Sequence, residues 1–496
     1  MNKSDFIKQI ILIEKEDKKI MLDNIIINKK INKFNRIFIY SSLYEKFILK
    51  NNKEKAAFYT NFDIAFEMVK LSLKNFSKKE LSNKKILDPA VWTGIFIFAL
   101  IKYLEEELDF NKKELNEFII KNINIQDIDK ESIDFFLFLL ENVLNIKNFK
   151  NIIIDSFFNN KNKYDIIIWN PPYWLSLKKE KEIIKNHYKL QQKEELSNDS
   201  YGLFFLHAFN LLNEKWIIVF ITPNSFMNIK NFYWLRKILI DYIDEIILLN
   251  KNVFKNKITN LQPWIETVIT KIKKEKTNNL KIVNNLEINY LRSKDYSIDY
   301  SKKNIRILNK KNLKKIYNIP LSFFLTDELI DILIDNKFKK VKDYFDSAMW
   351  IKTANNNLFL NKKKTKQYKD KFIKGTSKEK QEYKCDIYDY IDFENFINNR
   401  PKNSNLPQDK FLDKDIFKIW IPEIWHKWLM TAFKYKDEYV SNSIWIYRLK
   451  EEFYSEKQIE FFVNLLNQPI YKEITKVFSN NIRLEKHVID NLPIIK

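Results

Sequence analysis

The sequence predicts an α/β protein with a mostly parallel sheet and helices on both faces, followed by a C-terminal α+β domain. Two observations predict this fold class. From about residue 51 to residue 270, short apolar runs alternate with helical stretches, which is the pattern of a doubly wound sheet. After about residue 321, aromatic residues alternate with Lys and Asn, and no strand–helix rhythm is visible.

Seven apolar runs are expected as strands because they are rich in β-branched residues and are separated by helical stretches. They are Lys85–Leu87, Ile123–Gln126, Ile152–Ile154, Asp165–Ile168, Trp216–Ile221, Glu245–Leu249 and Glu266–Ile272. Around them we expect four segments: a helical N-terminal segment at 1–50, the α/β domain at 51–273, a connector at 274–320 and a second domain at 321–496. The charged stretch Asn361–Lys384 is expected to be a solvated loop.

Composition limits the classes of function. The 496 residues contain 86 Lys and Arg against 64 Asp and Glu, a net charge of +22. This surplus favours a nucleic-acid partner over an anionic membrane, although the codon bias of an AT-rich genome explains part of it. One cysteine, Cys385, and four His without paired metal-ligand spacing predict no disulfide and no metal.

Targeting signals are not visible in the sequence. No apolar run approaches the roughly 18 residues of a membrane span. The first residues carry acids and lack a small-residue cleavage site, unlike a signal peptide. We therefore expect a cytoplasmic protein without a membrane partner.

The strongest local signal is Asn170-Pro171-Pro172-Tyr173, directly after an expected strand. The two prolines end the strand and stiffen the loop, because each lacks a backbone donor. An amide oxygen and a nearby carbonyl can accept both hydrogens of an exocyclic amine, and the aromatic ring can stack on a planar base. A plain Pro-Pro turn is the alternative, but ligands bind at the carboxyl ends of strands in such sheets.

A second signal lies upstream, in the strand, turn and helix start from Ile86 to Phe96. Such a turn normally approaches a nucleotide-like ligand closely with its backbone. Asp127 ends the next strand, where an acid suits hydrogen bonds to ribose hydroxyls. Either piece alone is equally typical of a capping Asp, but their order before the Asn-Pro-Pro-Tyr motif favours a cofactor site.

Together these segments resemble the S-adenosylmethionine-dependent DNA adenine-N6 methyltransferases of restriction–modification systems, over about residues 51–272. The resemblance implies a Rossmann-like class I methyltransferase fold, S-adenosyl-L-methionine as cofactor, and a flipped adenine in double-stranded DNA as substrate. It also implies a monomer, with a separate restriction endonuclease as a possible partner. Residues from 321 onward resemble, more weakly, the fused target-recognition domains, but which of them read bases is not visible.

The resemblance implies roles for matching residues. It places Asn170, Pro171, Pro172 and Tyr173 in the catalytic motif, and Tyr173 and Phe254 on the target base. The cofactor-binding residues it implies are Tyr59 and Thr60 for the methionine part, Asp88, Pro89, Ala90 and Gly94 in the cofactor loop, Asp127 on the ribose, and Asp155, Ser156 and Phe157 at the adenine.

The glycine content is abnormal. The chain has 3 glycines and 11 tryptophans, whereas average usage would give about 35 glycines. Tryptophan stands where the family has glycine in four turns: Trp92, Trp169, Trp216 and Trp350. We hypothesise that UGA codons of this gene specify glycine and were translated as tryptophan. The alternative is a decayed, inactive methyltransferase, because an indole at position 92 obstructs the cofactor loop.

Two other functions remain open from the sequence. Methyltransferases that act on RNA or on a protein glutamine share the catalytic motif, but they usually lack a large C-terminal domain. A catalytically dead DNA-binding relic is the other alternative, and genuine tryptophans at 92 and 169 would favour it.

Overall fold

The computed structural model describes residues 20–22, 25–27, 32–51, 60–173, 200–229, 232–254, 266–286, 297–316, 321–348, 351–379, 382–422, 430–436, 438–441, 444–478 and 486–495. The chain divides into two compact units, Met1–Asn318 and Ile319–Lys496. Each unit has its own sheets and buried side chains.

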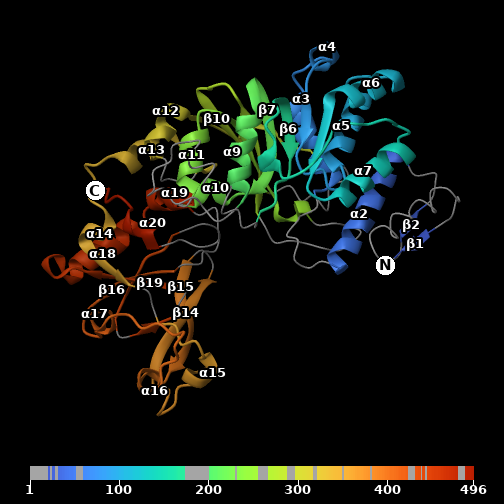
Figure 1. Ribbon diagram of the computed structural model, residues 1–496. Helices are drawn as coiled ribbons and strands as arrows, with labels where there is room; N and C mark the ends of the chain where they lie inside the picture. The colour runs from blue at the N-terminus through green and yellow to red at the C-terminus, as the bar shows by residue number, and fades with distance from the viewer. Residues whose placement is uncertain are drawn as a thin grey trace. The chain divides into compact units, whose positions relative to one another are not determined.

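Unit 1 is built on a nine-stranded sheet with the order β11-β10-β8-β9-β7-β6-β3-β4-β5 (Figure 1). Strands β3 to β8 and β10 all run in one direction, whereas β9 and β11 run in the opposite direction. The strand bounds are β3 Ile86–Asp88, β4 Ile123–Asp127, β5 Ile152–Ile154, β6 Tyr164–Trp169, β7 Leu212–Pro223, β8 Ile243–Leu249, β9 Thr267–Lys273, β10 Asn279–Asn285 and β11 Ile305–Asn309.

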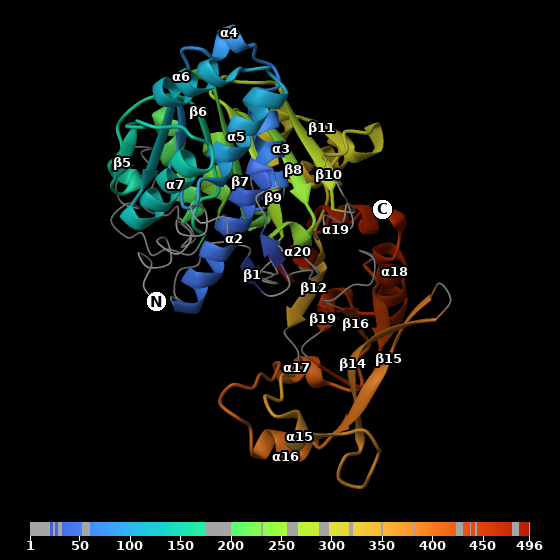
Figure 2. The ribbon, with the colours of Figure 1, turned by 90° about the vertical axis from the view of Figure 1, so that its right-hand side faces the viewer.

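Helices cover both faces of this sheet (Figures 1 and 2). Their apolar residues face the sheet, and unit 1 therefore has one continuous core on each side. The main helices are α2 Lys33–Asn51, α3 Phe62–Leu73, α5 Ile95–Glu106, α6 Lys112–Asn122, α7 Lys130–Asn142, α9 Tyr201–Leu211 and α11 Tyr233–Leu239.

The strand order places three loops together. Strand β3 lies between β4 and β6, all three parallel, so the chain reverses its direction of travel across the sheet at β3. Ligands of open α/β sheets bind at such a switch point, outside the carboxyl ends of the strands. Asp88 and Asp127 are the last residues of β3 and β4, and Asn170 directly follows β6, so all three lie at this edge.

The expected fold class is confirmed, and each of the seven expected strands is present. The segment expected as a connector is different, because residues 279–285 and 305–309 form β10 and β11 of the same sheet. The N-terminal segment also contains more than helix. Strands β1, Ile20–Leu22, and β2, Ile25–Ile27, form a short antiparallel hairpin there before α2.

Unit 2 contains two four-stranded sheets, β12-β19-β16-β17 and β13-β15-β14-β18. The strands are β12 Phe345–Ala348, β13 Leu360–Asn361, β14 Asp370–Glu379, β15 Glu382–Ile391, β16 Lys418–Pro422, β17 Phe433–Tyr435, β18 Tyr439–Val440 and β19 Ile444–Leu449. The expectation of a solvated loop at 361–384 was wrong. Strands β14 and β15 form a long antiparallel hairpin there, which the high charge of its sequence concealed.

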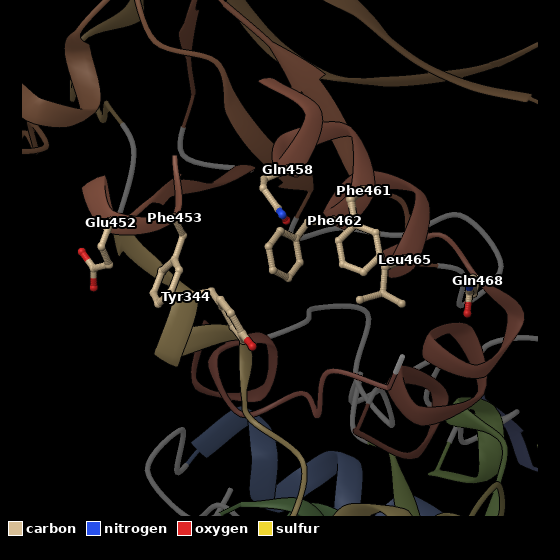
Figure 3. Close-up of a pocket in the computed structure, with 8 residues that line it drawn as sticks. All are labelled: Tyr344, Glu452, Phe453, Gln458, Phe461, Phe462, Leu465 and Gln468. Carbon is tan, nitrogen blue, oxygen red and sulfur yellow. The ribbon is translucent and has the colours of Figure 1, made fainter. Parts of the chain in front are cut away.

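Helices α13 Asp327–Ile334, α14 Val341–Tyr344, α15 Asn356–Phe359, α16 Phe393–Asn398, α18 Glu456–Leu466, α19 Pro469–Phe478 and α20 Lys486–Asp490 complete unit 2. A pocket opens beside α18, lined by aromatic rings such as Tyr344, Phe453 and Phe461 with Glu452 at one end (Figure 3). It holds none of the expected site residues. Within the described parts of both units, no helix combines the length and the apolar character that crossing a membrane requires.

Candidate active site

The turn after β3 is built around a buried carboxyl group. Asp88 ends β3, and its Oδ1 accepts a hydrogen bond of 3.3 Å from the amide of Ala90. Its Oδ2 is buried without a hydrogen-bond partner among the described residues. Burial raises the pKa of Asp88 well above its ordinary value, and the nearby Asp127 raises it further. An orphaned buried carboxylate oxygen is costly unless a ligand completes it.

Two residues of this turn have left-handed backbones. Gly94 has φ +81°, and a Cβ there would lie 2.2 Å from the ring of Phe136, so only glycine fits. Trp92 has φ +47°, a conformation that residues with a Cβ rarely adopt. The backbone of the cofactor loop therefore favours glycine at the position where the sequence has tryptophan.

Asp127, at the end of β4, holds the turn from the neighbouring strand. Its Oδ2 accepts a hydrogen bond of 3.0 Å from the amide of Trp92, and its Oδ1 accepts one of 2.9 Å from the amide of Asp129. Burial raises its pKa. Asp127 thus fixes the left-handed residue of the loop, and the ribose role assigned by resemblance would share these oxygens.

Gln126 positions the segment with Asp155 and Ser156. Its fully buried side chain donates hydrogen bonds to the carbonyls of Asp155 and Ser156, at 3.0 and 2.9 Å. Its Oε1 accepts one from Asn160 at 2.7 Å. The Asp155 carboxylate is exposed, while the Phe157 ring is buried and points to the core rather than to the open edge.

Both polar atoms of the Asn170 side chain form hydrogen bonds within the protein. Its Nδ2 donates to Thr60 Oγ1 at 3.0 Å, and its Oδ1 accepts from the Tyr173 hydroxyl at 2.6 Å. Pro171 is buried and Pro172 half-buried, and the carbonyl of Pro172 accepts a hydrogen bond from Ser200 at 2.7 Å. Thr60 and the catalytic motif are 110 residues apart in the chain, and the fold brings them into direct contact.

The two rings expected to hold the target base are buried. Tyr173 is 1% exposed and packs edge-on against Tyr201, with ring centres 6.2 Å apart. Phe254, in the 3-10 turn Lys251–Phe254, is 3% exposed. Asn61 donates to the carbonyl of Val253, which ties the Phe254 turn to the start of α3. Stacking on a base therefore requires both rings to leave their packed positions.

Trp169 lies directly before the motif and fills the core beneath it. Its ring centre is 5.0 Å from that of Phe157, 4.8 Å from Phe204 and 5.6 Å from Phe220. Its indole Nε1 is buried without a hydrogen-bond partner in the described chain. At Trp216 the left-handed residue is instead the preceding Lys215, with φ +69°. Trp350 lies outside the described residues, as does Tyr59, the candidate for the methionine part of the cofactor.

Two site-forming residues were missed from the sequence. Gln126 and Asn61 were not predicted to contribute, yet they fix the Asp155 segment and the Phe254 turn. The role of Gln126 could have been predicted, because it is a polar residue in an expected strand. The hydrogen bond of Asn61 could not have been predicted from the sequence, since its partner is 192 residues away.

The chemical groups of this site suit S-adenosylmethionine, with the exception of the Trp92 side chain. The cofactor carries a sulfonium and an ammonium group, which suit the unpartnered carboxylate oxygen of Asp88. The loop that follows lies at the carboxyl edge of the sheet, where nucleotide-like ligands bind in this fold. The indole of Trp92 is the element that does not fit.

Residues 14–254 match the family model of the Eco57I restriction-modification methylases. This range contains all the loops described above. Residues 14–254 are therefore similar to restriction–modification methyltransferases.

The type II methyltransferase M.AccI of Acinetobacter calcoaceticus is 31% identical to this chain over 227 residues. The aligned region covers 44% of this chain and 37% of that protein. The chain therefore matches well under half the length of that curated relative.

Two solved structures of protein–DNA complexes share the fold. The nuclease-deletion mutant of the Type ISP enzyme LlaGI, in complex with a DNA substrate mimic, has a TM-score of 0.54 at 15% identity, covering 98% of this chain and 58% of that chain. The DrdV–DNA complex has a TM-score of 0.53 at 14% identity, covering 86% of this chain and 53% of that chain. At these identities the likeness shows the fold of this chain alone.

Proposed function

We propose that this protein transfers a methyl group from S-adenosyl-L-methionine to N6 of adenine in double-stranded DNA, as the modification enzyme of a restriction–modification system. One observation carries the proposal: Asn170-Pro171-Pro172-Tyr173 follows β6, whose neighbour β3 leads into the Asp88 turn. An amine acceptor and a cofactor loop therefore share one edge of the sheet. The proposal includes a monomer and a separate endonuclease.

Adenine N6 is unreachable inside a stacked duplex, so the base must be flipped out. The Asn170 Oδ1 and the carbonyl of Pro171 would then accept the two hydrogens of the N6 amine. In the structure the Tyr173 hydroxyl occupies that Oδ1. The adenine amine replaces this hydroxyl, and the freed Tyr173 ring stacks on the base.

The chemistry is mainly positioning and electrostatics. S-adenosylmethionine supplies an electrophilic methyl group when it is bound. The two oxygen acceptors orient the N6 lone pair and stabilise the positive charge that develops on the nitrogen. Thr60 keeps the amide oriented, because it accepts a hydrogen bond from the Asn170 Nδ2.

The test is transfer of labelled methyl groups to duplex DNA, with product analysis for N6-methyladenine. We expect Asn170→Ala and Tyr173→Ala to lower turnover by about 10²–10³-fold, the loss typical of one removed transition-state contact. Asn162→Ala is the matched control, because this exposed residue precedes β6 whereas Asn170 follows it. Each variant is made in the chain as given and in one with glycine at 92, 169, 216 and 350.

Full activity in either motif variant would refute the assignment. Methyl transfer to RNA or protein, with none to DNA, would favour the other substrate classes that share the motif. Binding of DNA without transfer in both backgrounds would favour the inactive relic.

A further inference from the structure

One segment of unit 2 is basic without any acid. Residues 352–369 contain six lysines and no Asp or Glu, whereas 64 acids in 496 residues would place about two in 18 residues. All six side chains are exposed: Lys352, Lys362, Lys363, Lys364, Lys366 and Lys369. Codon bias alone explains the lysines but not the missing acids.

Lysines beside this segment differ from the six within it, because they form ion pairs with acidic residues. Three on the same sheet or next to it are paired with acids, at 2.9 Å for Lys371–Glu438, 2.8 Å for Lys374–Asp389 and 2.7 Å for Lys414–Asp370. None of the six lysines of residues 352–369 has an ion pair within the described residues. Their charges therefore remain available to an external anion.

The segment is held on a rigid support. Ile351 and Phe359 are buried in one hydrophobic cluster with Phe372 and Ile391 of β14 and β15. Asn361 pairs with Tyr390 of β15. The lysines therefore extend from backbone that the core and the sheet already fix.

Hydrogen bonds order the remaining loop. Gln367 donates to Asp392 at 2.8 Å, and the Tyr368 hydroxyl donates to the carbonyl of Leu358 at 3.1 Å. The amide of Tyr368 donates to Thr365 Oγ1 at 3.0 Å. Because the loop is already ordered, a ligand that binds it loses less conformational entropy.

We propose that residues 352–369 bind the phosphate backbone of duplex DNA. This inference rests on the proposed function and assigns a phosphate-contacting surface to unit 2. Lysine ammonium groups are point charges suited to phosphates, and such contacts fix a protein's register on the duplex without reading its sequence. The pocket beside α18 is unsuited to this role, because it is lined by aromatic rings and Glu452 rather than by cations.

The experiment compares two full-length variants with equal loss of charge. The test variant carries Lys362→Gln, Lys363→Gln, Lys364→Gln and Lys366→Gln. The control carries Lys79→Gln, Lys147→Gln, Lys150→Gln and Lys161→Gln, four exposed lysines that precede β3, β5 and β6 at the sheet edge opposite the candidate active site. Both lower the net charge by four.

Fluorescence anisotropy with a labelled DNA duplex is measured over a series of salt concentrations, with a structured RNA as the second probe. We expect the test variant to bind duplex DNA at least about tenfold more weakly at low salt. The slope of log affinity against log salt should become shallower by about 3 to 4, since each lost phosphate contact removes about 0.9. The control should keep the wild-type slope, and in methyl transfer the test variant should show a raised KM for DNA with kcat retained.

An unchanged slope in the test variant overturns the inference, as does an equal change in both variants, which would reflect net charge alone. A loss confined to RNA also overturns it. If neither the chain as given nor the chain with glycine at 92, 169, 216 and 350 methylates DNA, the proposed function fails instead, and a lysine-dependent slope would still support the binding surface. Unfolding temperatures of all three proteins check that the surface changes leave the fold intact.

Discussion

Trp92 has a left-handed backbone conformation that suits glycine better than tryptophan. A side chain in the left-handed region costs about 1–2 kcal/mol, and here it stands in the loop that follows Asp88. We expect Trp92→Gly to raise the affinity for S-adenosylmethionine at least about tenfold, because it removes the indole and the strain together. Calorimetric titration measures this.

Trp216→Gly is the contrasting variant. Trp216 lies in β7, stacks on Phe76 at 5.3 Å and has Lys84 4.1 Å from its ring centre, so its removal should lower the unfolding temperature without a gain in cofactor affinity. Unchanged or weaker cofactor binding in Trp92→Gly would contradict the steric argument. The codon hypothesis has its own direct check: UGG at positions 92, 169, 216 and 350 would exclude it.

Asp88 makes a prediction about pH. Burial raises its pKa well above the ordinary 3.8, so the folded chain holds the proton more tightly than the unfolded chain does. Stability contributed by this group is therefore present at low pH and lost as pH rises from about 4 through the folded-state pKa. Asp88→Asn keeps an acceptor for Ala90 and removes the charge, so it should unfold at a higher temperature than the wild type at pH 8.

The same variant should bind S-adenosylmethionine more weakly, because in the proposed function the Asp88 carboxylate would face the cationic cofactor. Thermal unfolding from pH 4.5 to pH 8 follows the stability difference, which should grow with pH. Asp134→Asn, an exposed carboxylate paired with Lys130, should change neither property. A less stable Asp88→Asn protein at pH 8 would show that another group completes this carboxylate.

At the level of elements, Gln126 links β4 to the loop after β5. We expect Gln126→Leu to lower the free energy of unfolding by about 1–3 kcal/mol, because the carbonyls of Asp155 and Ser156 lose this donor and the Asn160 amide loses one of its two acceptors. Urea denaturation measures this change. Asn159→Ala removes an exposed hydrogen bond to Asp155 and should stay within about 0.5 kcal/mol. A Gln126 variant as stable as this control would mean that water replaces the buried network.

The sequence predicted the elements whose residues are almost all apolar, because such composition indicates burial. The runs in β3, β6 and β8 are apolar because both faces of a parallel sheet are covered. Strand β10 escaped notice because its sequence, NLKIVNN, mixes buried and partly exposed positions. The order of the motifs in the sequence predicted which loops lie close together, because each motif follows a strand of the same parallel sheet. The closed contact of Tyr173 with Asn170 was not predictable, because it depends on side-chain packing around Tyr201.

At the scale of the whole molecule, the boundary between the units lies near residue 318. Each unit buries its own core, and the sheets of one share no strands with those of the other. We therefore expect residues 1–318 and 319–496 to fold when expressed separately, each with a cooperative thermal transition.

The separated units also divide the proposed activities. Unit 1 contains the Asp88 turn and should bind S-adenosylmethionine, whereas unit 2 contains residues 352–369 and should bind duplex DNA with a steep salt dependence. Neither should methylate DNA efficiently alone, because positioning of the adenine needs both. Calorimetry, anisotropy and methyl transfer measure the three properties in parallel. A unit 1 that methylates DNA as fast as the full chain would show that unit 2 contributes no binding energy to the reaction, and the lysine surface would then have to serve another anion.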